Sequence, residues 1–120
     1  MKKTDIKRLA LIKYYYQQGL KQLEQKEPLN GFSILVFHDS VELFLNLICE
    51  TYDVKFPDNF MQYWEVINNK TKPMELSYKA PMEKLNKARV GFKHHGIIPS
   101  TTDIESFSVI TKSFFEDNFE

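Results

Sequence analysis

Residues 31–53 read GFSILVFHDSVELFLNLICETYD. In a helix, apolar side chains such as Ile34, Phe37 and Val41 would occupy most of the circumference of this stretch and leave a thin polar line. That line consists of His38 or Asp39, Glu42, Asn46, Glu50 and Asp53. A helix that is apolar on nearly every side needs other helices around it. We therefore predict that residues 31–53 form the central helix of an all-α bundle.

The flanking segments repeat apolar residues at steps of three and four, which is typical of amphipathic helices. Residues 5–27 form the first, with a core stripe of Leu9, Ile12, Tyr16, Leu20 and Leu23. A short helix is predicted over about 58–69 with Asp58 as its N-cap. A long helix begins near Pro81 and ends at Gly96, and a last one begins at a capping box of Ser100 with Asp103 or Thr102 with Glu105.

The five prolines support these boundaries, because they fall between the periodic segments or at their starts. They are Pro28, Pro57, Pro73, Pro81 and Pro99. No stretch alternates with the period of a strand. The sequence therefore predicts an up-and-down bundle of four long helices and one short helix, formed by residues 1–120 as a single domain.

The composition excludes several classes of protein. Ten Phe and six Tyr among 120 residues are too many for a disordered chain. A single cysteine, Cys49, excludes a disulfide framework and a multi-cysteine zinc site. Without an uninterrupted apolar run or a signal peptide, we expect a cytoplasmic protein that does not enter the membrane. The last predicted helix carries Phe114, Phe115 and Phe119 almost to Glu120, without a stop signal or a polar tail. This pattern is expected of the N-terminal domain of a longer protein.

The charges are balanced overall but unevenly distributed. The chain has 16 basic and 16 acidic residues, yet residues 70–96 contain seven basic and two acidic ones. This cationic stretch can pair with acidic helices of the bundle, bind an anion, or do both.

Common catalytic patterns are absent, including glycine-rich phosphate loops and nucleophile elbows. Two of the three histidines, His94 and His95, are neighbours and diverge on a helix by about 100°, so they do not converge on one metal ion. Cys49 lies in the apolar helix and is expected to be a buried thiol. We expect neither a metal nor a cofactor.

Residues 85–96 read LNKARVGFKHHG, in which four residues separate Arg89 from His94. This segment resembles the signature of the HEPN superfamily, whose helical domains carry an arginine followed after four to six residues by a histidine. The upstream stretch HDSVELFL, residues 38–45, is similar to the second helix of that family, in which a glutamate, here Glu42, faces the motif. The resemblance covers most of the chain and implies a HEPN-like helical bundle.

The resemblance also implies an activity, namely metal-independent cleavage of RNA by a homodimer. Arg89 would stabilise the phosphorane, His94 would transfer a proton, with His95 as the second choice, and Glu42 would orient one of them. The products would be a 2′,3′-cyclic phosphate and a 5′-hydroxyl. Catalytic relatives of this kind occur in toxin and antiphage systems, where the partner is an antitoxin or a C-terminal regulatory domain.

Elementary chemistry is consistent with this site. The C-terminal end of a helix favours an imidazolium by several tenths of a kcal/mol to about 1 kcal/mol. Arg89 offers a planar fork for phosphate oxygens, and Lys87 and Lys93 add charge for substrate binding. Five residues along a helix rotate by about 140°, so Arg89 and His94 of one chain point apart. A groove shared by two protomers would bring them together.

Other interpretations remain open. Arg89 can pair with Glu42 or Glu83 within the bundle, and His38 can be an ordinary core histidine. Val90 stands where active HEPN members often carry a polar residue, which favours a non-catalytic module for dimerisation or partner binding. Gly96 stands where some toxin members have a tyrosine, so nucleotidylation there is not expected.

Overall fold

The computed structural model describes residues 3–72 and 75–118, and over these residues it is helical without strands. Its α-helices are α1 (Lys3–Leu23), α2 (Phe32–Thr51), α3 (Tyr63–Thr71), α4 (Lys79–His95) and α5 (Thr101–Asn118). Two 3-10 turns, η1 (Leu29–Gly31) and η2 (Phe60–Gln62), precede α2 and α3. The predicted all-α bundle is confirmed; Pro73 and Phe119 lie outside the described residues.

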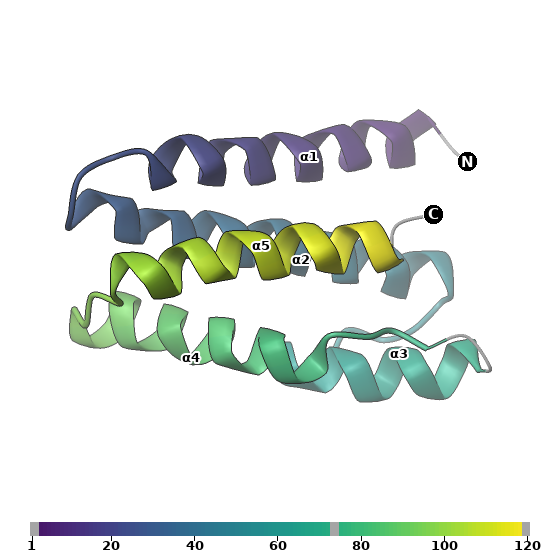
Figure 1. The fold of residues 1–120 in the computed structure, drawn as a ribbon. Coiled ribbons are helices and arrows are strands. Elements are labelled where there is room, and N and C mark those ends of the chain that lie inside the picture. Colours follow the sequence, from purple (N-terminus) through teal and green to yellow (C-terminus); the bar gives the residue numbers. More distant parts are fainter. Residues whose placement is uncertain (1–2, 73–74, 119–120) are drawn as a thin grey trace.

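The four long helices alternate in direction, and α3 lies along the same edge of the bundle as α4 (Figure 1). Helix α2 contacts each of the other four helices, and α1 packs on it most extensively. The central role predicted for this helix is therefore confirmed. By length and composition, residues 29–51 could also cross a membrane, but the core helix of a soluble bundle has the same properties.

The buried face of α1 differs from the stripe predicted for it. Ile12 is buried as expected, but Leu20 is 38% exposed. The buried residue at this level is Gly19, where an added Cβ would lie 2.5 Å from Cε1 of Phe37. Because α1 approaches α2 this closely, only glycine fits there, and the neighbouring leucine turns outward.

Short polar contacts define the helix starts. Asp58 was the predicted cap of the short helix, but the side chain of Asn59 accepts the hydrogen bond from the backbone N–H of Gln62, at 3.2 Å. The predicted cap of the last helix is confirmed, since Ser100 Oγ accepts from the backbone N–H of Asp103 at 3.1 Å. The Ser100 interaction therefore sets the start of α5.

The segment before α4 is anchored on α3. The Asn68 side chain accepts from the N–H of Leu76 at 2.6 Å and donates to its carbonyl at 3.3 Å. One turn earlier on α3, the indole of Trp64 donates to the carbonyl of Ser77 at 2.8 Å. These bonds hold the chain just before Lys79, where α4 begins, and so help to position every side chain of α4.

Candidate functional site

The face of α4 that lies against α2 carries a row of hydrogen-bond donors. Buried Met82 and Leu85 mark the side of α4 that enters the core. Asn86, Arg89 and Lys93 follow at steps of three and four, which places them along one edge of that side. Asn86 and Arg89 are half-buried, whereas Lys93 is exposed.

On α2, the facing side chains form a compact polar cluster. His38, Asp39 and Glu42 each contribute a nitrogen or carboxylate oxygen, and these atoms lie within 4.8 Å of one another. His38 is 1% exposed, Glu42 is half-buried and Asp39 reaches solvent. The acidic group expected here was Glu42 alone, and the structure adds two neighbours to it.

His38 links the two helices. Its Nε2 lies 2.9 Å from Oδ1 of Asn86, and because a carbonyl oxygen only accepts, Nε2 carries the proton. Nδ1 is buried without a hydrogen-bond partner among the described residues, and the ring packs 4.1 Å from that of Phe60. Burial, together with the charges of Arg89 and Lys93, lowers the pKa of His38 to about 4 despite the Asn86 bond. His38 is therefore a neutral core histidine.

Asp39 faces the cations of α4. Partial burial raises the pKa of its carboxyl, and Arg89 and Lys93 oppose that rise. Arg89 forms no ion pair with a carboxylate of the described residues, so its nitrogens lie more than 4.0 Å from the oxygens of Asp39. The charges are thus close enough to interact and too far apart to neutralise each other by contact.

The anticipated pairing of Arg89 with Glu42 or Glu83 is absent over the described part of the chain. The ion pair found there joins Arg8 of α1 to Glu50 of α2. Across residues 3–72 and 75–118, no carboxylate therefore pairs directly with the Arg89 guanidinium.

Glu42 lies toward α3. Its charge contributes to raising the pKa of Tyr63 to about 12, although burial is the larger cause. The Tyr63 hydroxyl donates a hydrogen bond to Oδ1 of Asn46, one turn further along α2. Glu42 therefore borders two neighbourhoods, the His38 cluster and the tyrosine.

His94 and His95 are exposed in the last turn of α4, and Gly96, with a φ of +64°, ends the helix as predicted. By the rotation of about 100° per residue, His94 lies about 140° around the helix from Arg89. Lys87 is exposed and falls on the same outward side as His94. The structure thus brings Arg89, Lys93 and the Glu42 cluster together within one chain and leaves His94, His95 and Lys87 apart from them.

The polar cluster on α2 has the side-chain types of a metal site. His38, Asp39 and Glu42 are close enough to share a cation. The charges of Arg89 and Lys93 act on the same groups, however, and would oppose the approach of a divalent ion. We therefore consider this cluster in terms of anion and proton chemistry.

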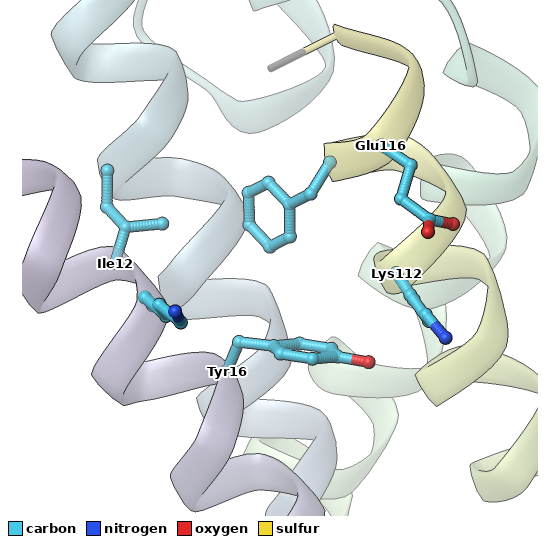
Figure 2. A pocket seen from close by; sticks show the side chains of 6 residues that line it. Ile12, Tyr16, Lys112 and Glu116 are labelled. Carbon is cyan, nitrogen blue, oxygen red and sulfur yellow. The ribbon is translucent and has the colours of Figure 1, made fainter. Parts of the chain in front are cut away.

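A separate hollow lies between α1 and α5, with a volume of about 260 Å³ (Figure 2). It is lined by Ile12, Lys13, Tyr16, Lys112, Phe115 and Glu116. Its floor is apolar, and none of its lining residues belongs to the polar face between α2 and α4. This hollow offers packing surface rather than a catalytic constellation.

Three members of the polar face were not identified as functional from the sequence. His38 and Asp39 were recognised only as alternatives on a polar line, and Asn86 was not considered. The signal was present, because His38 and Glu42 are four residues apart and Asn86, Arg89 and Lys93 follow helical spacing. Their meeting depends on the packing of α2 against α4, which brings together His38 and Asn86, 48 residues apart in the sequence, and spacing alone does not reveal it.

Comparisons with known protein families, curated proteins and solved structures find no match to the chain.

Proposed function

We propose that the chain is a metal-independent endoribonuclease of the HEPN type that acts as a homodimer. The observation that carries this proposal is the arrangement of Arg89, which is half-buried beside His38 and Asp39 yet has no ion-pair partner among the described residues. A guanidinium in that position is available to bind phosphate oxygens in two parallel hydrogen bonds. Asn86 and Lys93 add donors along the same face.

The reaction proposed is transesterification within RNA. The ribose 2′-oxygen attacks the adjacent phosphorus, and the 5′-oxygen of the next nucleotide leaves, giving a 2′,3′-cyclic phosphate and a 5′-hydroxyl. Negative charge grows on the phosphorane oxygens, and Arg89, with Lys93 nearby, is placed to stabilise it. His94 transfers a proton, and Glu42 helps to orient the polar cluster.

Dimerisation follows from the direction of His94. Within one chain, this residue points away from Arg89, so a complete site requires His94 of the partner subunit. An isologous interface brings the same surface of both chains together and would place the two α4 helices at the two-fold axis. Each groove would then contain Arg89 from one chain and His94 from the other.

The test is incubation of purified protein with single-stranded RNA in EDTA. We expect cleavage with cyclic phosphate ends, reduced about 100-fold or more in Arg89→Gln and His94→Ala. Arg8→Gln, which changes the other arginine of the chain, is the matched control that retains activity, and His95→Ala tests the second-choice histidine. RNA left intact by the wild-type protein at every salt concentration tested would overturn the proposal.

The competing proposal is a non-catalytic module of the same fold that docks a partner. The observation that favours it is the exposed apolar surface around the end of α4, where Val90 is 38%, Ile97 62% and Ile98 47% exposed. This proposal expects Arg89→Gln and His94→Ala to leave partner binding unchanged. A ribonuclease of a toxin or antiphage system is toxic on expression. Toxicity of the wild type that disappears in those two variants would therefore favour the ribonuclease instead.

A further inference from the structure

Asp39 lies on α2 opposite the cations of α4. It belongs to the cluster of atoms within 4.8 Å that includes His38 and Glu42. Across the interface, its carboxylate interacts with the charges of Arg89 and Lys93 without an ion pair to Arg89. A carboxylate set opposite two phosphate-binding cations matches a ligand that has a hydroxyl donor next to a phosphate.

The proposed reaction needs two proton transfers at different places. One proton leaves the attacking 2′-hydroxyl, and another is delivered to the departing 5′-oxygen on the opposite side of the phosphorus. His94 cannot reach the Arg89 face of its own chain, because it lies about 140° around α4. A second group is therefore needed on the α2 side of the groove.

We propose that Asp39 is the catalytic residue that accepts the 2′-hydroxyl proton in the same chain as Arg89, an inference that rests on the proposed ribonuclease function. The 2′-oxygen forms a bond to phosphorus as its proton passes to the Asp39 carboxylate. The bond from phosphorus to the 5′-oxygen breaks, and that oxygen takes a proton from the imidazolium of His94 of the partner subunit. No oxidant or metal is consumed. Before the next cycle, protonated Asp39 releases its proton to water, and the neutral imidazole of His94 of the partner subunit takes one up.

The neighbouring groups are less suited to this role. His38 is buried beneath Phe60, and its one N–H is engaged by Asn86. Glu42 is half-buried, and its charge acts on Tyr63 of α3. Asp39 is the most exposed of the three, and its carboxylate interacts with Arg89 and Lys93.

The balance of charges also suits a base. Burial raises the pKa of Asp39 above that of an ordinary aspartate, which strengthens it as a proton acceptor. Arg89 and Lys93 limit the rise. Of the other groups in the cluster, His38 is neutral near pH 7, and the charge of Glu42 also acts on Tyr63.

The first experiment compares RNA cleavage by wild type, Asp39→Asn and Asp39→Glu as a function of pH. General-base catalysis is worth about 10²- to 10⁴-fold, so we expect Asp39→Asn to lose that factor in kcat while its affinity for RNA is retained. The acidic limb of the pH profile should disappear in Asp39→Asn, and Asp39→Glu should recover part of the rate. Asp58→Asn, an exposed aspartate before η2, is the matched control.

The second experiment measures binding without cleavage. In the His94→Ala background, we expect tighter binding of an RNA oligonucleotide than of DNA with the same sequence, because DNA lacks the 2′-hydroxyl that donates to Asp39. Adding Asp39→Ala, which removes the accepting oxygen, should abolish that preference, and circular dichroism checks that each variant is folded.

The outcomes separate this inference from the proposed function. Cleavage by Asp39→Asn at the wild-type rate, or an unchanged RNA preference in the double variant, would overturn the role of Asp39 and leave the ribonuclease intact. A wild-type protein that cleaves no RNA would remove the ribonuclease itself, and with it the role of Asp39.

Discussion

A single buried histidine joins the candidate site to the stability of the fold. His38 is held neutral between Phe60 and Asn86, with Arg89 and Lys93 disfavouring its protonated form. In the unfolded chain, the same imidazole titrates near pH 6.5. Between the folded pKa of about 4 and this unfolded pKa, the unfolded state binds a proton that the folded state does not.

We predict a stability loss on mild acidification that depends on His38. Because the pKa of His38 is about 4 in the folded state, the stability linked to its neutral form is complete above pH 6.5 and is lost as the pH falls toward 4. Between pH 8 and pH 5, this linkage removes about 2 kcal/mol from the free energy of unfolding. Urea unfolding followed by circular dichroism measures it.

The variant that isolates this effect is His38→Gln, whose amide can donate to Asn86 but does not titrate. Between pH 8 and pH 5, its free energy of unfolding should fall by about 2 kcal/mol less than that of the wild type. His94→Gln, at an exposed position, should behave like wild type. Equal pH dependence in all three proteins would contradict the assignment of His38.

At the level of the helices, the register of α4 depends on a side chain of α3. Asn68 binds both backbone groups of Leu76, which is buried in the segment that leads into α4. The Asn68 amide thus pairs with the N–H and the carbonyl of Leu76, as the backbone of a neighbouring strand does in a sheet. Any change in the segment would shift the start of α4 and therefore the position of Arg89.

We predict that Asn68→Ala destabilises the protein by about 1 to 3 kcal/mol, because the N–H of Leu76 is left buried without its partner. Asn69→Ala makes the same chemical change at an exposed position of the same helix and should be close to neutral. Thermal unfolding of the two variants provides the comparison. A similar loss in both would show that helix propensity, rather than the bond to Leu76, determines the effect.

The helices could be predicted from local patterns, whereas their contacts could not. Apolar periodicity identified α2 as the central helix, and Gly96 and Ser100 marked an end and a start correctly. The exposure of Leu20 follows from the close approach of Gly19 to Phe37, and that distance depends on tertiary packing. The joining of His38 to Asn86 has the same origin, so the sequence drew attention to Arg89 and Lys93 but not to the rest of the polar face.

At the scale of the whole molecule, the outward side of α4 is the surface that dimerisation would cover. Val90 lies there with His94 and Lys87, and all three are exposed in the single chain. A cationic helix placed against its own copy is repelled unless apolar contacts or an anion intervene. In the proposed homodimer, Val90 would supply the apolar contact at this point.

We predict that Val90→Glu converts a homodimer to a monomer and abolishes cleavage, because a buried carboxylate without a partner is costly. Val109→Glu introduces the same charge at an exposed valine of α5 and should leave the dimer intact. Sedimentation equilibrium at micromolar concentration distinguishes the two. A wild-type protein that is strictly monomeric, or two variants that sediment alike, would contradict the shared groove.

The packing of the lone tryptophan has an optical consequence. Trp64 is 1% exposed, and its ring lies 5.5 Å from that of Phe60, which in turn packs on His38. An indole in such dry surroundings should emit at short wavelength, and the nearby imidazole should quench that emission when it gains a proton. The intrinsic fluorescence of the chain would then report the protonation of His38 without any attached dye.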